Sequence, residues 1–430
     1  MMRLPLPCAA LLASLWVIPV AAQVSNPPAL PEASPEIAVS SNAWQFFTGT
    51  NAASKKTSVA NPPDDFAIRL QNARHLRLGR LFAEAGVLYE DLLQSPAPEQ
   101  IQRTALIDMA EMAQEQNDPS RAQQIYAQCL GRWPKDVGAP EILLRQGLVY
   151  RQMGMFRLAI SKFYTVMTSA LTLKPDSFDY YQQLVLRAQN EIAETQYEEG
   201  KYADAVDSFG RLLKLESPPS NRSTLAHRFI HCLVALGRQD EAIGQAQDFL
   251  ERYPEVPERP EVHFLCATAL KKAGRDAEAL QQVLALLREQ QGHGAGAARN
   301  LAYWQRRAGN EIANEFYQEG DPMKALDIYI SLAALDAAPD WQLPVWYQIG
   351  LVFERLNQPA KAVEYYGNIT RREKEVAADA PPSLKAVLEM AKWRADFLGW
   401  QLKAETTDLE LRSATLGLAK ANALPHQSLP

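Results

Sequence analysis

The chain has 430 residues, a formal net charge of −6, 47% apolar residues and 22% charged residues. This is a globular composition, and at this length it predicts two domains or a repeat array rather than one compact core. The mild negative charge argues against a nucleic-acid-binding protein, because such proteins usually present a basic surface.

Residues 1–22 have the pattern of an export signal. Arg3 supplies a positive start, Ala9 to Val20 form an apolar run, and small residues precede Gln23, where we expect cleavage. An uncleaved anchor is the alternative. No later stretch approaches the roughly 20 apolar residues of a membrane helix. We therefore expect an exported protein, periplasmic or secreted, with no transmembrane helix in the mature chain.

Residues 23–64 are rich in proline and small polar residues and show no sustained periodicity, which predicts a flexible linker. Trp44, Phe46 and Phe47 interrupt this composition. They form either a short docking motif or a segment that folds back onto the first repeat. The cost of exposing clustered aromatic rings favours the second interpretation.

Helical periodicity is continuous from about Asp65, and an alanine recurs within it at spacings of 37, 37, 46, 37, 37, 46 and 37 residues. A turn residue precedes each alanine by five positions. The alanines are Ala85, Ala122, Ala159, Ala205, Ala242, Ala279, Ala325 and Ala362. The turn residues are Arg80 (beside Gly79), Asn117, Gly154, Gly200, Gly237, Gly274, Gly320 and Asn357.

These positions have a physical logic. Two antiparallel helices pack closely where a small side chain lets their backbones approach, and the residue four positions later lies on the same face. Glycine and asparagine tolerate the left-handed conformation that ends a helix. The residues four positions after each alanine are Tyr89, Tyr126, Phe163, Phe209, Ala246, Val283, Tyr329 and Tyr366. Pro96, Pro134, Pro218, Pro254 and Pro339 are expected to close second helices.

The pattern resembles the tetratricopeptide-repeat (TPR) family. Repeat three carries the signature at Leu143, Gly147, Tyr150, Gly154, Phe156, Ala159 and Phe163, and repeat eight at Trp346, Gly350, Phe353, Ala362 and Tyr366. The resemblance implies an all-α, right-handed superhelical solenoid of about eight helix-turn-helix repeats over residues 65–370. The 37-residue spacing is similar to that of exported bacterial TPR proteins of the BamD-like and Tol–Pal accessory types.

A 120-residue duplication underlies the two longer intervals, because the segment from Glu191 to Gly200 matches the segment from Glu311 to Gly320. The nine extra residues predict long helices over 179–197 and 297–317, with a longer loop as the alternative for the second. The stretch 292–296 is expected to be a loop.

The C-terminal part is predicted to cap the solenoid. After the break at Pro381 and Pro382, Ser383 is expected to cap a helix that runs to about Leu402. This helix belongs to a capping region over residues 371–422, followed by a tail over residues 423–430. A terminal cap needs one polar face, and such a face is expected at Lys385, Glu389, Lys392 and Asp396.

Catalytic and metal-binding signals are weak. His227 and His231 stand one helical turn apart, which is metal-ligand spacing, but no third ligand lies nearby in the sequence. Cys129, Cys232 and Cys266 are too few and too scattered for a disulfide framework, and a pair between Cys232 and Cys266 is left open against buried thiols. We expect no catalytic residue, metal or cofactor. A metal-dependent hydrolase using the two histidines is the alternative from another class.

The resemblance further implies a non-catalytic scaffold of the bacterial cell envelope that binds partner proteins or peptide segments along its concave surface, which the first helices line. A structural envelope or secretion-machinery component is the alternative, and the sequence leaves the oligomeric state open. An ordinary solvated face is the competing interpretation of the groove positions. Mapped onto this sequence, those positions are Arg151, Arg187, Asn190, Glu194, Tyr197, His227, His231, Lys271, Lys272, Arg307, Asn310, Asn314, Tyr317 and Tyr347.

Overall fold

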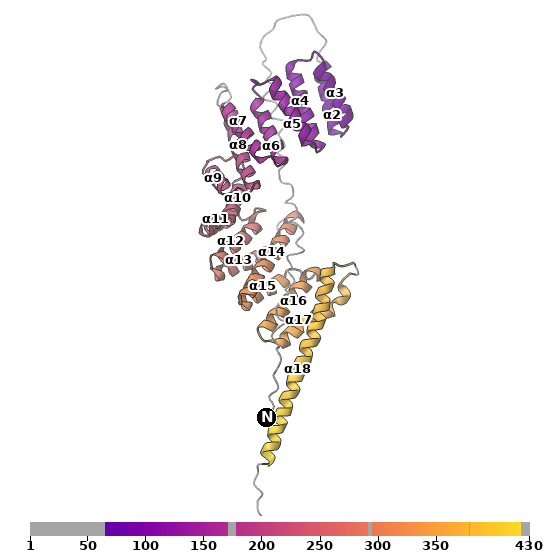
Figure 1. Cartoon of the computed structure of the whole chain (residues 1–430), viewed down its shortest axis with the longest axis vertical. Helices are drawn as coiled ribbons and strands as arrows, with labels where there is room; N and C mark the ends of the chain where they lie inside the picture. Colours follow the sequence, from indigo (N-terminus) through magenta and orange to yellow (C-terminus); the bar gives the residue numbers. More distant parts are fainter. Residues whose placement is uncertain (1–64, 171–177, 291–294, 378, 423–430) are drawn as a thin grey trace, which may run out of the picture. The chain divides into compact units, whose positions relative to one another are not determined.

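The computed structural model describes residues 65–170, 178–290, 295–377 and 379–422, and over these residues it is all-helical (Figure 1). The predicted export signal, the linker with Trp44, Phe46 and Phe47, and the tail from residue 423 lie outside the described residues. The chain divides into two compact units at Gly274, the turn of the sixth repeat. We call residues 51–274 the N-terminal unit and residues 275–430 the C-terminal unit, and each is described by itself.

The N-terminal unit consists of helices that pack in chain order, each mainly against its sequence neighbours. They are α2 (Asp65–Leu78), α3 (Phe82–Gln94), α4 (Glu99–Glu115), α5 (Pro119–Arg132), α6 (Ala139–Gln152), α7 (Phe156–Ala170), α8 (Phe178–Glu198), α9 (Tyr202–Leu213), α10 (Arg222–Ala235), α11 (Gln239–Arg252) and α12 (Arg259–Lys272). The even-numbered helices are the first helices of successive repeats.

The C-terminal unit continues the same alternation and ends in a much longer helix. Its elements are α13 (Asp276–Arg288), α14 (Ala295–Glu319), α15 (Pro322–Ala333), α16 (Pro339–Arg355), α17 (Pro359–Arg371), the short 3₁₀ helix η3 (Glu373–Glu375) and α18 (Pro382–Asn422). Helix α18 packs against α17 and, over a smaller area, against α16. No helix among the described residues is long and apolar enough to cross a membrane.

The predicted repeat frame is confirmed at every position. All eight frame alanines are fully buried, and the residues four positions later are at most 1% exposed. All eight turn residues have a positive φ, between 55° and 97°. Five of these are glycine, which adopts this conformation without steric cost, and the other three are Arg80, Asn117 and Asn357. The sequence period therefore marks where each helix pair turns and where it closes.

Small residues on the first helices complete the contact. A Cβ atom added to Gly147 would lie 2.5 Å from the ring of Phe163, and one added to Gly350 would lie 2.4 Å from the ring of Tyr366. Both rings stand on the second helix of the same repeat and are fully buried. In repeat five the sizes are exchanged, because the buried pair at these positions is Ile230 and Ala246. Each repeat therefore combines one large and one small side chain at this contact.

Two predictions about the longer intervals have different outcomes. The long helices are confirmed as α8 with 21 residues and α14 with 25, so a longer loop in the second copy is wrong. The loop expected over 292–296 is wrong at its end, because Ala295 and Gly296 belong to α14, while residues 292–294 lie outside the described residues. The first turn of a helix tolerates glycine because its N–H groups have no intrahelical partner there.

The C-terminal prediction also needs correction. Helix α18 begins at Pro382, so Ser383 lies inside its first turn, and it continues to Asn422, twenty residues beyond the expected end at Leu402. The added stretch contains many strong helix formers, including Ala, Glu, Leu and Lys. Pro339 is the first residue of α16 and not the end of the preceding helix. Proline suits this first position, where its missing N–H costs nothing.

Candidate binding surface

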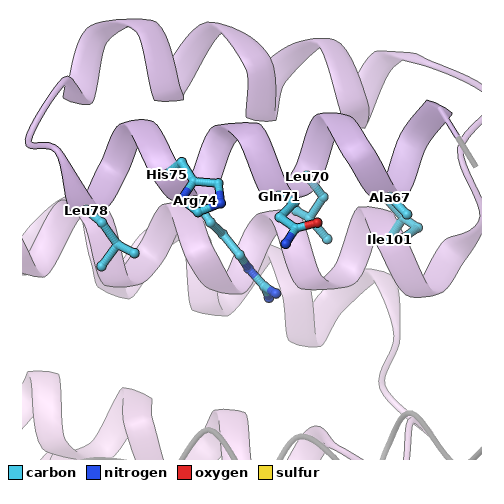
Figure 2. A pocket seen from close by; sticks show the side chains of 7 residues that line it. All are labelled: Ala67, Leu70, Gln71, Arg74, His75, Leu78 and Ile101. Atoms are coloured by element: carbon cyan, nitrogen blue, oxygen red, sulfur yellow. The ribbon is translucent and has the colours of Figure 1, made fainter.

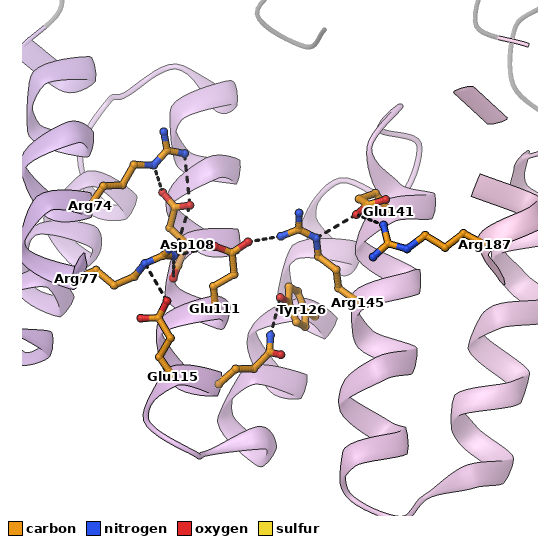
Figure 3. Close-up of polar contacts among 10 residues, drawn as sticks. Arg74, Arg77, Asp108, Glu111, Glu115, Tyr126, Glu141, Arg145 and Arg187 are labelled. Carbon is orange, nitrogen blue, oxygen red and sulfur yellow. Dashed lines mark hydrogen bonds and ion pairs between the residues drawn. The ribbon is translucent and has the colours of Figure 1, made fainter. Parts of the chain in front are cut away.

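A series of ion pairs between acidic and basic side chains joins the first helices of the N-terminal unit. We call this series the charge ladder, and Figure 3 shows its first part. Most of its contacts join residues 34 positions apart. The repeat is 37 residues long, so a separation of 34 is about one helical turn less. The partner of each side chain therefore lies about one turn before the equivalent position of the next repeat.

At the N-terminal end of this unit the charge ladder runs from α2 through α4 to α6. Arg74 Nε donates to the Asp108 carboxylate at 2.6 Å, and Arg77 Nη1 donates to Glu111 at 2.8 Å. The other carboxylate oxygen of Glu111 accepts a hydrogen bond from Arg145 Nη1. Arg145 Nε also donates to Glu141 at 3.3 Å. Since Asp108 and Arg145 are buried, these pairs lie largely out of water.

The charge ladder continues from α6 through α8 and α10 to α12. Arg187 Nη1 lies 3.7 Å from Glu141, and Arg151 Nη1 donates to Glu191 at 2.7 Å. Glu194 lies 3.5 Å from Arg228 Nε, and the Arg228 guanidinium also stacks over the ring of Tyr197. At the last step, His227 Nε2 lies 3.1 Å from the Glu261 carboxylate.

Burial and ion pairing act in opposite directions on the acids of the charge ladder. Burial raises the pKa of Asp108 above its ordinary value even though Arg74 lowers it, and burial likewise raises the pKa of Glu194 despite Arg228. Glu261 has the opposite balance. Burial raises the pKa of its carboxyl, but the close contact with His227 and the charges of His227, His231 and Arg228 together outweigh burial and hold the pKa below its ordinary value.

This balance at Glu261 predicts a dependence of stability on pH. A carboxyl whose folded pKa is lowered stabilises the fold above its unfolded pKa, and this contribution is lost as the pH falls through the folded pKa. We expect the unfolding free energy of the native chain to drop more steeply below about pH 4.5 than that of Glu261→Gln. Urea unfolding between pH 3 and 7 measures this, with the exposed Glu255→Gln as control. Parallel pH profiles for the native chain and Glu261→Gln would contradict the assignment.

Four of the predicted groove residues lie on one face of α8, at offsets of three, seven and ten residues from Arg187: they are Arg187, Asn190, Glu194 and Tyr197. Arg187 is partly exposed, and its only ion pair among the described residues is the long one to Glu141. The Asn190 side-chain oxygen and Arg187 Nε have no hydrogen-bond partner in the described residues. The face therefore retains unused polar groups beside a partly exposed guanidinium.

The 120-residue duplication places an equivalent set on α14, in the C-terminal unit: Arg307, Asn310, Asn314 and Tyr317. Their contacts differ from those on α8. Arg307 donates to Glu311 on its own helix at 2.9 Å, and Asn314 accepts a hydrogen bond from Tyr329 at 2.6 Å. The Arg355 guanidinium stacks over Tyr317. Asn310 is partly exposed.

The remaining predicted groove residues do not form one site. His231 packs edge-on against the ring of Tyr197, with ring centroids 5.3 Å apart, whereas His227 is buried against Glu261. Lys271 and Lys272 lie at the end of α12, where Lys272 is exposed. Arg151 is engaged by Glu191. Among the described residues there is no group of three or more His, Cys, Asp or Glu side chains that could hold a metal ion.

Tyr347 belongs to a different structure, a polar junction that fixes α18 onto the C-terminal unit. Arg394 Nη1 on α18 donates to both carboxylate oxygens of Glu354 at 2.9 Å, and its Nε donates to the Tyr347 hydroxyl at 3.1 Å. The Tyr366 hydroxyl also donates to Glu354. Tyr347 is buried, so the structure places it as an anchor of the capping helix rather than as an exposed groove residue.

A shallow hollow of about 390 Å³ lies along α2, at the start of the N-terminal unit (Figure 2). Arg74 stands at its edge and also pairs with Asp108, so the hollow adjoins the first step of the charge ladder. Its lining residues are Ala67, Leu70, Gln71, Arg74, His75, Leu78 and Ile101.

Cys129, Cys232 and Cys266 are all buried, and no disulfide bond joins them in the described part of the chain. Cys232 and Cys266 do stand on first helices of adjacent repeats, as expected. Burial raises the pKa of Cys129 to about 11 and that of Cys232 to about 12. These thiols are therefore protonated and unreactive while the fold is closed.

The sequence interpretation missed the charge-ladder residues outside the predicted groove positions. They are Arg74, Arg77, Asp108, Glu111, Glu141, Arg145, Glu191, Arg228 and Glu261. A usable signal was present, because opposite charges recur 34 residues apart within a chain whose repeat is 37. The frame identified which residues lie on first helices, but the partner of each side chain depends on the stagger between neighbouring helices.

Both units are therefore built from helix-turn-helix repeats with a small-to-large contact inside each repeat, which defines a helical-repeat solenoid. Two tetratricopeptide-repeat family models match the sequence, one over residues 231–300 and the other over residues 343–374. The chain therefore contains tetratricopeptide repeats, and repeats of this kind form protein–protein interaction scaffolds. Neither matching model describes an enzyme family.

No curated protein matches the chain significantly by sequence. Similar solved structures include a tetratricopeptide-repeat protein from Parabacteroides merdae, with 13% identity, a TM-score of 0.39, and coverage of 67% of this chain and 98% of that chain. Part of a repeat protein from Cytophaga hutchinsonii has 12% identity, a TM-score of 0.40, and coverage of 69% and 98%. The apo form of RapI has 12% identity, a TM-score of 0.48, and coverage of 81% and 94%. We draw no functional conclusion from these low similarities.

Proposed function

We propose that this chain is an exported scaffold of the bacterial cell envelope that binds an extended segment of a partner protein on its first helices. The observation that carries the proposal is the repeated set on α8 and α14, with arginine, asparagine and tyrosine at equivalent positions of one helical face in each unit. An asparagine amide can bind a peptide backbone as donor and acceptor, and an arginine can bind a carboxylate.

The ion pairs of the charge ladder engage several predicted groove residues, so fewer of them are available to bind a partner. Arg151, Glu194 and His227 are already paired with neighbouring repeats, so they position the helices instead of meeting a partner. Asn190 is buried, so Arg187 on α8, with Arg307 and Asn310 on α14, remain the strongest contact candidates. A partner segment that carries acidic side chains suits the arginine of each unit taken by itself.

The binding prediction concerns Arg187→Glu and Arg307→Glu. Each reversal opposes an acidic partner segment, and we expect at least a tenfold loss of partner binding, or about 1.4 kcal/mol. Partners are first captured by crosslinking in living cells, and affinities are then measured with purified protein. The matched controls are Arg157→Glu on α7 and Arg371→Glu on α17, both exposed arginines on second helices. Equal binding by all four variants would exclude these two faces.

The envelope location and the relationship to BamD-like or Tol–Pal accessory proteins belong to the same proposal. The signal pattern of residues 1–22 and the 37-residue spacing support them. Cell fractionation of the full chain tests the location, with an expected mature N-terminus at Gln23. A cytoplasmic, full-length product would contradict export. It would not change the interpretation of the affinities, which are measured with purified protein.

A further inference from the structure

One face of α18 carries a stripe of aromatic side chains that the rest of the C-terminal unit does not cover. Trp393, Phe397 and Trp400 are 63%, 48% and 68% exposed, and the rings of Trp393 and Phe397 stack with centroids 5.5 Å apart. The opposite face packs on the unit through the buried residues Ala391 and Leu398. The four residues of the expected polar cap face, Lys385, Glu389, Lys392 and Asp396, are all exposed, and the aromatic stripe lies beside them on the exposed side of α18.

Helix α18 also continues well past its supporting helices (Figure 1). Its 41 residues run to Asn422, whereas every described side chain from Lys403 to Thr415 is exposed. Leu409 and Leu411 are 67% and 64% exposed. A single helix without tertiary contacts is marginally stable in water, so this extension is more readily explained by a partner helix.

The exposed stripe has the spacing of a coiled-coil seam. Alternating steps of four and three residues place successive side chains on one face, with small or apolar groups at five of six positions. The sequence continues the same steps through Ala414 to Leu418. This seam consists of Trp393, Phe397, Trp400, Ala404, Thr407 and Leu411.

The charges that flank the seam favour a second copy in parallel orientation. In a parallel pair in register, Lys403 of one helix faces Asp408 of the other. At the other flanking positions Asp396 and Glu410 face Gln401 and Thr415, and Glu389 faces Arg394, which is already bound to Glu354 of its own unit, so no like charges meet. An antiparallel pair with Phe397 opposite Trp400 would bring Asp396 against Lys403 but also the like charges Glu389 and Glu410 against each other. The acidic flanks also make an anionic membrane surface a poor occupant.

We infer that a second copy of this chain covers the aromatic stripe, with the two α18 helices forming a parallel, two-stranded coiled coil. The pairing buries the seam on the side of α18 that faces away from α16 and α17, so each C-terminal unit keeps its own core. This assembly is independent of the partner surface on α8 and α14.

Light scattering on the purified mature chain, residues 23–430, tests the pairing. We expect a dimer mass, and we expect Trp400→Glu and Leu411→Glu to weaken dimerisation at least tenfold, since each places a charge inside the seam. Thr406→Glu, an exposed position of α18 outside the seam, is the matched control. Circular dichroism checks that each variant remains folded. A monomer at every concentration, or a dimer that both seam variants leave intact, would overturn the inference.

Oxidation of Leu411→Cys tests the orientation. A parallel pair in register brings the two introduced thiols together across the seam, so we expect a covalent dimer, whereas Thr406→Cys should not crosslink. The natural residues Cys129, Cys232 and Cys266 are buried and do not compete. A dimer that does not crosslink through residue 411 would overturn the parallel arrangement.

Discussion

Phe163→Ala is expected to destabilise the N-terminal unit by about 3–5 kcal/mol, because the ring is fully buried and its loss leaves a cavity between α6 and α7. Tyr164→Ala, at the next position, is the control, since Tyr164 is 53% exposed and its replacement should change stability by about 0.5 kcal/mol or less. Urea unfolding followed by circular dichroism measures both. Similar losses for the two variants would refute the assigned burial.

The contact between Gly147 and Phe163 makes a sharper test possible. Gly147→Ala alone is expected to cost about 1–3 kcal/mol, because its new methyl group would lie 2.5 Å from the Phe163 ring. In the Phe163→Ala background the same substitution meets no ring, and alanine favours a helix by about 1 kcal/mol over glycine. The two changes should therefore be strongly non-additive. Additive costs would show that the glycine is not required by the ring.

Arg145→Ala is expected to cost about 3–5 kcal/mol, because it removes one partner from a buried charge pair and leaves Glu111 and Glu141 without it. Burial opposes the charged form of Arg145, but the charges of Glu111, Tyr126 and Glu141 and the hydrogen bond to Glu111 together outweigh burial and raise its pKa. Arg145 therefore stays ionised in the folded state.

The control for Arg145 is Arg412→Ala on α18. Arg412 forms an ion pair with Asp408 at 2.9 Å, but both side chains are exposed, and such pairs contribute about 0–1 kcal/mol. Denaturant unfolding at low and high salt separates the two cases. The Arg412 pair should weaken with added salt, whereas the effect of Arg145→Ala should persist, because buried charges are screened less. Equal and salt-sensitive losses would argue against a buried ladder.

The sequence was sufficient to predict the repeats because their determinants are local. A turn residue and an alanine five positions later, as at Gly154 and Ala159, fix where one helix ends and how closely the next approaches. Neither determinant depends on a neighbouring repeat. The period of 37 therefore located eight turns correctly, including the one at Arg80, where the residue type alone argues against a positive φ.

The prediction of exposed groove residues was less accurate, because the ion-pair partner of each side chain lies in another repeat. Arg151 and His227 do lie on first helices, as the frame requires, but their acids come from the next repeat. The end of α18 was missed for a related reason. Its N-terminal half shows the pattern of a packed cap, whereas the side chains from Lys403 to Thr415 are all exposed and pack on no other helix of the described residues.

The labelling rates of the three buried cysteines can report how often the helices around them separate. Cys129, Cys232 and Cys266 all stand in the N-terminal unit, on α5, α10 and α12. A thiol reagent can reach them only when the surrounding helices separate, so each labelling rate measures how often its own repeat opens. Mass spectrometry could follow the three rates in the unmodified protein. Repeats that open independently would label at three rates, and a unit that opens as a whole would label at one.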